Sequence, residues 1–190
     1  MPIIVASQYF SAFPSDPEAF VIRSPRLVLR PLLLQDAPRI CAVVNDWEVI
    51  KQTVSQPFPF TLRDAEDMIL DAWQSVDDDE ELVLGIQRTS DTALIGAMAI
   101  NHDGMLAEVG YWIGRQYWSQ GYATEALAAL LRQIRARWGI AIVDAVAFRE
   151  NYASAAVLRK CGFTHRGSQK SNLPDRGGER MLSHFRWEAG

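Results

Sequence analysis

The sequence predicts a single mixed α/β domain, and three observations support this. Its 190 residues are enough to bury one core without disulfide or metal support. Short apolar strands outnumber the helices, which interrupt them irregularly, and there is no internal repeat. A strand, a helix and a second strand follow one another over 107–147, which predicts a parallel, right-handed crossover inside the sheet.

The two ends of the chain have different patterns. Residues 1–24 lack a regular apolar period and contain scattered prolines, so we expect an irregular N-terminal extension followed by the domain over 25–190. The first residues also lack the basic segment with which a signal peptide begins. The segments with strand-like apolar character, in chain order, are 26–32, 82–88, 93–100, 107–114, 140–148 and 180–188.

Helices are expected where apolar residues recur every three or four positions. These segments are 37–45, 61–74, 124–138 and 151–162. Asp36 is placed to N-cap the first helix. Thr61 and Asp64 have the spacing of a capping box at the second helix. Gly139 and Gly162 suit helix ends.

Composition bears on what the chain could bind. A formal net charge of −4 lacks the basic footprint of a nucleic-acid partner, and the sequence has no apolar run of the roughly 20 residues that span a bilayer. Cys41 and Cys161 are far apart in the sequence, which favours two buried thiols in a reducing compartment and a cytoplasmic protein. The three histidines have no ligand spacing, so we expect no metal.

The stretch YWSQGYATEALAALL, residues 117–131, turns abruptly from a loop into a helix. The first N–H groups of a helix are unpaired and its dipole places about half a positive charge there, so this point suits an anion. Gly121 lets a ligand approach the main chain closely. The segment has no phosphate-binding lysine motif. The sequence therefore predicts a main-chain cradle for phosphate or diphosphate, although the glycine could also serve the turn alone.

Several segments together resemble the GNAT superfamily of acetyl-CoA-dependent N-acetyltransferases. They are LRPL near the start, LIG on a middle strand, AEVGYWIGRQYWSQGYATEAL, and NYASAAVLRKCGF. The resemblance covers about 24–188 and is closest to the Rim-type branch, which acetylates ribosomal-protein N-termini. It implies a twisted, mostly antiparallel sheet flanked by helices. In that fold a strand pair splays at a bulge and leaves a slot for the thioester of acetyl-CoA.

The resemblance also assigns coenzyme-binding residues. The diphosphate would be held by main-chain N–H groups of the loop, namely Ser119, Gln120, Gly121, Tyr122, Ala123 and Thr124. Trp118 departs from the general superfamily pattern but is common in the Rim-type branch. The main chain of Trp112 and Ile113 would pair with the pantetheine arm like an added strand. Asn151 matches an asparagine that bonds the same arm, and it could equally be an N-cap.

For the catalytic residues, the sequence leaves alternatives open. Many relatives have a tyrosine acid where this chain has Leu158, so Ser154 or solvent would protonate the leaving thiolate. Glu108 is the acid on the strand that leads into the site and is our candidate base, with a structural ion pair as the alternative. Ser154 could also be an ordinary first-turn residue. A main-chain N–H near Ile113 would stabilise the oxyanion.

Other residues near the motifs have simpler expected roles. Tyr111, Trp112, Tyr117 and Trp118 are expected to pack in the core and at its rim. Arg159 and Lys160 could meet a phosphate or simply end a helix.

The predicted function is direct transfer of an acetyl group from acetyl-CoA to a primary amine, with no covalent enzyme intermediate. The acceptor could be a protein N-terminus or a small amine. Its surface would come from the helix pair over 37–75, the PFPF loop, and the loop around NLPDRGGER. The alternative is a GNAT-like module that binds coenzyme A or a partner without catalysis. We expect a monomer or a homodimer.

Overall fold

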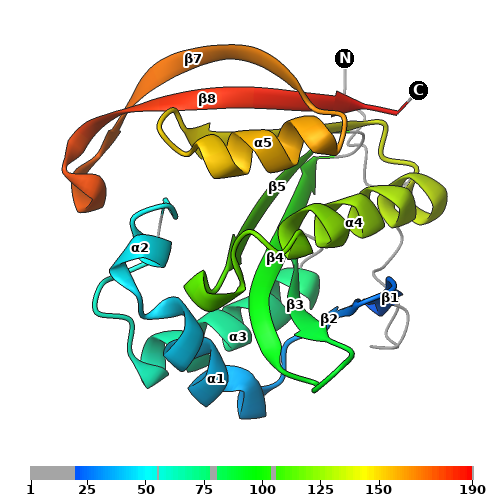
Figure 1. The fold of residues 1–190 in the computed structure, drawn as a ribbon, viewed down its shortest axis with the longest axis vertical. Coiled ribbons are helices and arrows are strands. Elements are labelled where there is room, and N and C mark those ends of the chain that lie inside the picture. Colours follow the sequence, from blue (N-terminus) through cyan, green and yellow to red (C-terminus); the bar gives the residue numbers. More distant parts are fainter. Residues whose placement is uncertain (1–19, 55, 78–80, 104–105, 190) are drawn as a thin grey trace, which may run out of the picture.

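The computed structural model describes residues 20–54, 56–77, 81–103 and 106–189. Within them one eight-stranded sheet runs in the order β1-β2-β3-β4-β5-β6-β8-β7 (Figure 1). Its strands are β1 (Ile22–Arg23), β2 (Leu27–Pro31), β3 (Glu81–Arg88), β4 (Leu94–Asp103), β5 (Leu106–Ile113), β6 (Ile142–Phe148), β7 (Thr164–Leu173) and β8 (Gly178–Glu188). Neighbouring strands are antiparallel except β5 and β6, which are parallel. The mixed, mostly antiparallel sheet and its parallel strand–helix–strand unit are confirmed.

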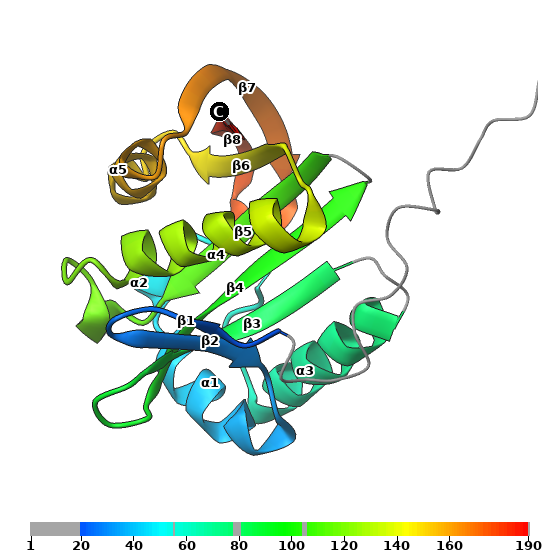
Figure 2. The ribbon, with the colours of Figure 1, turned by 90° about the vertical axis from the view of Figure 1, so that its right-hand side faces the viewer.

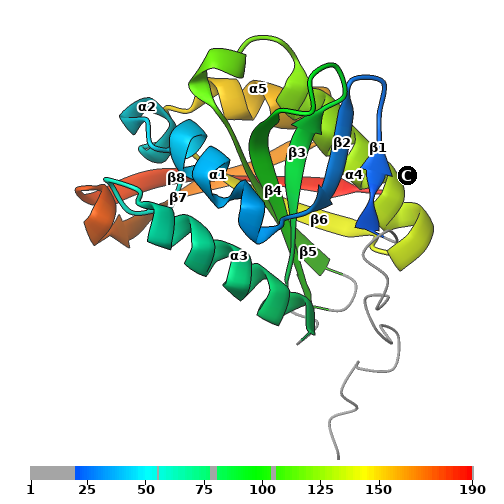
Figure 3. The ribbon, with the colours of Figure 1, turned by 90° about the horizontal axis from the view of Figure 1, so that it is seen from below.

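Helices cover both faces of the sheet. They are α1 (Ala37–Val44), α2 (Trp47–Ile50), α3 (Leu62–Asp77), α4 (Tyr122–Trp138) and α5 (Tyr152–Lys160), with 3-10 turns η2 (Leu34–Asp36), η3 (Arg115–Tyr117) and η4 (Pro174–Arg176). Helices α1 and α3 lie on one face of the sheet, and α4 lies on the opposite face (Figures 2 and 3). Each face has its own apolar cluster, and burial of these clusters from water supplies the main driving force for the fold.

Alternation along β5 separates the two clusters. Ala107, Val109 and Ile113 are buried in the cluster beneath α4 and α5, whereas Trp112 packs against the cluster around α1 and α3. Side chains of successive strand residues point to opposite faces, so Glu108 lies on the Trp112 side. The alternation expected from the sequence therefore holds along this strand.

Strands β5 and β6 part after only three paired residues. Their parallel register runs from Leu106 opposite Ile142 to Glu108 opposite Asp144 and then stops. On its other side, β5 keeps an unbroken register with β4, from Gly96 opposite Ile113 to Asp103 opposite Leu106. The splay is therefore present, but it arises without the bulge that was expected in this strand pair.

The expected N-terminal boundary at residue 24 is wrong for its last residues. Phe20 and Ile22 are 4% and 3% exposed, and Ile22–Arg23 pairs with β2. This short strand completes the sheet edge because its apolar side chains join the core beneath α4. The rest of the expected extension lies outside the described residues.

Asp36 occupies the expected N-cap position of α1, but its side chain is engaged elsewhere. Its side chain makes no cap bond. Instead, both carboxylate oxygens accept hydrogen bonds from Arg30, at 2.7 and 2.9 Å, and one also accepts from the Leu33 N–H. A buried carboxylate is satisfied better by a guanidinium than by one amide. By contrast, the capping box at α3 is confirmed: the Thr61 N–H donates to Asp64, and the Asp64 N–H donates to Thr61 Oγ.

Strand β7 and helix α2 are elements that the sequence did not indicate. Strand β7, THRGSQKSNL, is polar and mostly exposed, so it lacks the apolar alternation that marks a strand. It is formed by its ladder with β8 at the edge of the sheet. Edge strands need bury little apolar surface, and polar side chains protect them from association.

No described helix is long and apolar enough to cross a membrane. Among the described residues, no cluster of three histidine, cysteine or acidic side chains could hold a metal ion.

Candidate active site

A cleft of about 530 Å³ opens where β5 and β6 separate. Its walls come from both splayed strands, the loop between β5 and α4, the first turns of α4 and α5, and the segment after α2. The cleft thus passes through the sheet between its two halves. It has room for an elongated ligand.

The edge of β5 presents main-chain groups to this cleft. The Gly114 N–H donates to Ile95 O of β4, at 2.9 Å. Because hydrogen bonding alternates along a strand, the main chain of Trp112 also faces β4, while the main chains of Tyr111 and Ile113 face the gap. Of the two residues expected to pair with the pantetheine arm, Ile113 therefore presents its main chain to the gap, whereas Trp112 presents its main chain to β4.

The loop before α4 has the backbone of an anion site. Ser119 and Gly121 both adopt positive φ, 60° and 82°, and Gly121 directly precedes the helix. Left-handed residues in such a loop turn successive N–H groups toward one point, and the unpaired N–H groups of the first helical turn add to them. A positive φ in a serine costs about 1 kcal/mol or more, and such strain is common where a backbone serves function.

Trp118 fastens this loop to β5. Its indole Nε1 donates to Ile113 O at 2.6 Å, which uses the last carbonyl of the strand edge. The expectation that Trp118 packs at the rim holds, since 40% of it is exposed. The contact ties the anion loop to the strand that lines the cleft.

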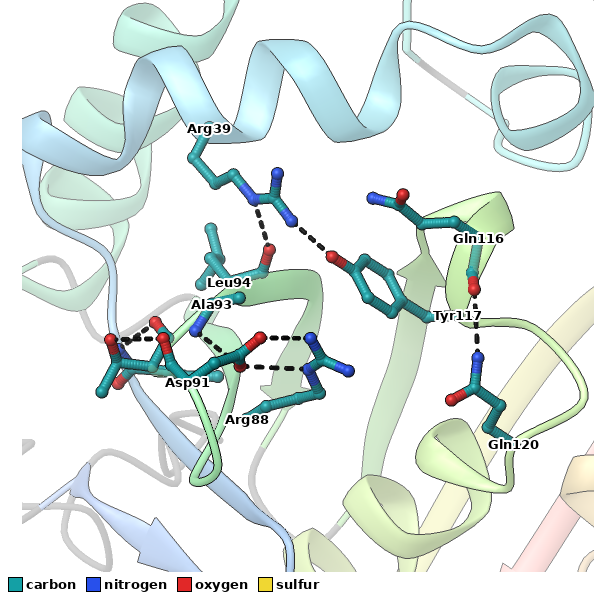
Figure 4. A network of polar contacts seen from close by, with 10 residues as sticks. Arg39, Arg88, Asp91, Ala93, Leu94, Gln116, Tyr117 and Gln120 are labelled. Carbon is teal, nitrogen blue, oxygen red and sulfur yellow. Dashed lines mark hydrogen bonds and ion pairs between the residues drawn. The ribbon is translucent and has the colours of Figure 1, made fainter.

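Helix α1 and strand β3 each brace η3, which leads into the loop, through an arginine that Figure 4 shows. Arg39 donates to Leu94 O at 3.0 Å and to the Tyr117 hydroxyl at 2.5 Å. Arg88, paired with Asp91, lies over the Tyr117 ring at 4.9 Å. Tyr117 is buried between two guanidinium groups, so η3 is held rigidly against the sheet.

Across the cleft, α5 presents Asn151 and Ser154. The Asn151 side chain accepts a hydrogen bond from the Ser154 N–H at 3.0 Å, so it is the N-cap of this helix. Ser154 Oγ lies 2.9 Å from the Tyr111 hydroxyl. Both Asn151 and Ser154 line the cleft.

Tyr111 is the functional candidate that the sequence reasoning assigned only to packing. Burial raises the pKa of its phenol to about 12, although the hydrogen bond with Ser154 works in the opposite direction. The phenol therefore keeps its proton at any ordinary pH. Its position on β5 opposite a serine of α5 depends on tertiary packing, and no spacing in the sequence signals it.

Leu158, where many relatives carry a tyrosine, is 1% exposed and belongs to the core. Nearby, burial raises the pKa of Cys161 to about 11. Its thiol is directed at Thr124 O, at 3.5 Å. Neither cysteine is among the residues that line the cleft, and both are free thiols.

Most of the expected site residues meet at the cleft. Those that line it are Trp112, Ile113, Ser119, Gly121, Tyr122, Ala123, Thr124, Asn151 and Ser154. Gln120 turns its side chain back to Gln116 O. Glu108 lies outside the lining, exposed at the point where β5 and β6 part, and its neighbour Asp144 takes the ion pair with Arg186. Lys160 reaches the lining, whereas Arg159 lies over Phe185.

Another part of the cleft wall comes from residues at and after α2. Val49 lies in α2, and Gln52 and Thr53 follow it. Arg176 of η4, 6% exposed, donates to Thr53 O at 2.7 Å and also to Gln56 O. Arg176 therefore joins the β7–β8 hairpin to the segment after α2.

Taken together, a helix start suited to an anion and a slot edged by strand main chain are features of acyltransferases that use a coenzyme A thioester. Residues 26–164 match the acetyltransferase (GNAT) domain family. Since the match spans most of the chain, the protein belongs to the GNAT acetyltransferase family.

Relatives of known sequence agree with this membership. The chain is 28% identical over 150 residues to the uncharacterized N-acetyltransferase YoaA of Bacillus subtilis (strain 168), covering 77% of this chain and 84% of the relative. It is 30% identical over 146 residues to the uncharacterized N-acetyltransferase p20 of Bacillus licheniformis, covering 75% and 81%.

A solved structure from Vibrio cholerae, provisionally described as a ribosomal-protein-serine acetyltransferase, has a TM-score of 0.76 and 26% identity, over 91% of this chain and 99% of that one. At 18% identity, an acetyltransferase of Salmonella typhimurium that modifies the N-terminal serine of ribosomal protein L7/L12 shares the fold, with a TM-score of 0.79 over 90% and 99%. The protein is an acetyl-CoA-dependent N-acetyltransferase, with acetyl-CoA as co-substrate.

Proposed function

We propose that the protein transfers an acetyl group directly from acetyl-CoA to the α-amine of a protein N-terminus or to a small primary amine. The observation that carries the proposal is the cleft itself, which is lined both by the loop before α4 and by residues at and after α2. The diphosphate would lie at the loop and the thioester near Ser154. The amine would then enter from the far end and attack within a ternary complex.

The residues divide the chemistry between them. The amine nitrogen forms a bond to the thioester carbonyl, and the oxygen of the tetrahedral intermediate is stabilised by the Ile113 N–H, which faces the gap. The carbon–sulfur bond then breaks, and the departing thiolate takes a proton from Ser154. The nitrogen loses its extra proton to a base, and a proton returns through solvent from that base to Ser154, so both groups recover their starting charge.

Tyr111 would position the proton of Ser154. If the buried phenol donates to Ser154 Oγ across the 2.9 Å contact, the serine proton cannot point back along the same line. It is then free to point into the cleft, toward the sulfur. Tyr111 acts here through Ser154, because the serine hydroxyl is the group that its phenol contacts.

Glu108 remains our candidate base, and it would act through water. A side chain added at Gly110 would meet nothing within 4 Å, so space is open beside Glu108 on the same face of β5. Residues two apart on a strand, such as Glu108 and Gly110, are separated by about 7 Å along the chain. This is too far for an amine beside Gly110 to pass its proton directly to Glu108. A base that acts through water suffices for an α-amine. The pKa of an α-amine is about 8, so its deprotonation at pH 7 costs roughly 1.4 kcal/mol, against about 4.6 kcal/mol for lysine.

A direct mechanism is supported by the cysteines, neither of which lines the cleft. The Rim-type likeness and the solved neighbour that modifies a ribosomal protein support a protein N-terminus as acceptor. A small amine stays open as the alternative. Two free thiols fit a reducing compartment, and on that ground we place the protein in the cytoplasm, as a monomer or homodimer.

The test is thiol release from acetyl-CoA in the presence of a panel of N-terminal peptides and small amines. Wild-type protein should release free coenzyme A with at least one of them. Ser154→Ala should lower kcat by roughly 10- to 100-fold, and Tyr111→Phe should lower it less. In a Ser154→Ala background, Tyr111→Phe should have no further effect, because its role passes through the serine.

Binding of coenzyme A without thiol release on any amine would instead favour the non-catalytic module. Glu108→Gln tests the base separately, through the pH profile of kcat/KM. An unchanged acidic limb would exclude Glu108.

A further inference from the structure

The turn between β1 and β2 lies at the edge of the sheet and contacts the anion loop before α4. This turn and the start of α4 lie at the same end of the molecule (Figure 2). Glu125, in the first turn of α4, accepts hydrogen bonds from the Ser24 hydroxyl at 2.7 Å and from the Arg26 N–H at 2.8 Å. The Arg26 guanidinium pairs with the other carboxylate oxygen at 2.7 Å. The edge strand β1 is separated from β6, on the other side of the cleft, by the four strands β2 to β5.

Arg26 also contacts the loop directly. Its Nη1 donates to Gln120 O at 3.1 Å, and its guanidinium lies 4.6 Å from the centre of the Tyr122 ring. A side chain added at Gly121 would stand 3.5 Å from its Nη2. Arg26 does not line the cleft, whereas Gly121 and Tyr122 do. The arginine therefore supports the loop from behind.

This contact fixes the direction of one N–H group. The carbonyl of Gln120 and the N–H of Gly121 belong to the same peptide plane, and in a trans peptide they point in opposite directions. Because Arg26 holds the carbonyl on the outer side, the Gly121 N–H must point the other way, toward the cleft. A free peptide at a glycine could rotate and withdraw that donor.

The same arginine balances a charge that would oppose an anion. Glu125 places a carboxylate within one helical turn of the expected diphosphate. Partial burial raises its pKa, but the hydrogen bonds from Ser24 and Arg26 outweigh burial and lower the pKa below its usual value, so the carboxylate stays ionised. Pairing with a guanidinium reduces its repulsion of a nearby anion.

We propose that Arg26 is a positioning residue for the coenzyme, which locks the Gln120–Gly121 peptide with its N–H toward the diphosphate and neutralises Glu125. The inference rests on the proposed binding of coenzyme A at this loop. Specifically, Arg26, at the far edge of the sheet, strengthens binding of the diphosphate part of coenzyme A and leaves binding of the pantetheine part unchanged.

The experiment compares two ligands on the full chain. The first is coenzyme A, and the second is pantetheine, which lacks the diphosphate. Arg26→Gln should raise the Kd of coenzyme A about 5- to 10-fold. Adding Glu125→Gln to this variant should recover part of the loss, because it removes the carboxylate that repels the anion. The Kd of pantetheine should stay the same. Arg23→Gln removes the same charge from an exposed position on β1 and should change neither.

Each other outcome has a definite meaning. If Arg26→Gln binds coenzyme A as tightly as wild type, the inference is wrong while the proposed function stands. If both ligands weaken equally, Arg26 only stabilises the fold and the inference is wrong again. If wild-type protein does not bind coenzyme A, the proposed function fails, and the clamp fails with it.

Discussion

The two ends of the cleft are built by different means. At the proposed coenzyme end, main-chain groups of the β5 edge and of the loop before α4 line the cleft. They come from one continuous stretch, 111–124, joined by the first turn of α5. At the proposed acceptor end, a wall is held by the side chain of Arg176, which bonds Thr53, 123 residues away in the chain.

The difference follows from what each end must recognise. A diphosphate and an extended pantetheine arm can be held by N–H groups and strand edges, which any sequence with the right backbone provides. An acceptor is distinguished by shape and charge, and these require side chains from several segments. Loops that carry such side chains can change while the coenzyme end stays fixed.

The largest expected effect is at Gly121. Valine at φ 82° is sterically unfavourable, so Gly121→Val should distort the anion loop and raise the Kd of coenzyme A by roughly 10- to 30-fold. Gly139→Val is the matched control, because Gly139 has φ 66° at the other end of α4. Titration calorimetry should show weakened binding only for the first variant. Equal binding in both would contradict the main-chain account of this end.

Gly110 tests the middle of the cleft. The position faces open space, and valine suits a strand, so Gly110→Val should fold at least as stably as wild type. The added side chain would occupy the path between Glu108 and the thioester. We expect kcat to fall on the order of tenfold while the Kd of coenzyme A stays unchanged. Full activity would mean that neither amine nor water uses this space.

Arg176 tests the acceptor end. Arg176→Gln removes donors from the carbonyls of Thr53 and Gln56 and should loosen the wall after α2. The acceptor KM should rise about fivefold, with a loss of stability of about 1–3 kcal/mol from the unsatisfied carbonyls. Arg166→Gln, which breaks an exposed ion pair with Glu188 in the same hairpin, should leave KM unchanged. Equal KM values in the two variants would show that Arg176 does not support the acceptor wall.

The smallest functional effect is expected at Glu81, at the start of β3 and outside both ends of the cleft. Burial raises the pKa of this carboxyl group in the folded protein. A raised folded-state pKa means that wild-type stability is highest below the unfolded value of about 4.3 and falls as pH rises through the folded value. Glu81→Gln should therefore unfold at higher urea than wild type at pH 7, with unchanged coenzyme affinity. A lower midpoint at pH 7 would contradict the assignment.

The sequence was most informative where function depends on local backbone. The loop around Gly121, the N-cap Asn151 and the capping box at Thr61 are each contained within a few residues, so spacing and residue type predict them. The parallel unit over 107–147 followed from the order of strand, helix and strand. Strand β7 was missed because it is polar and forms only through its pairing with β8. Asp36 has the expected N-cap position, but its carboxylate bonds Arg30 and not the helix amides, a contact that local spacing does not reveal.

By itself, the sequence determined the mixed sheet, the anion loop and the pattern of the GNAT family, because these depend on local conformation and on apolar periodicity. Only the tertiary structure decided that Tyr111 meets Ser154, that Arg26 supports the loop from the sheet edge, and that Glu108 lies outside the cleft lining. Each of these depends on residues about 30 or more positions apart in the chain. Such contacts are set by how helices pack on a twisted sheet, which local spacing cannot specify.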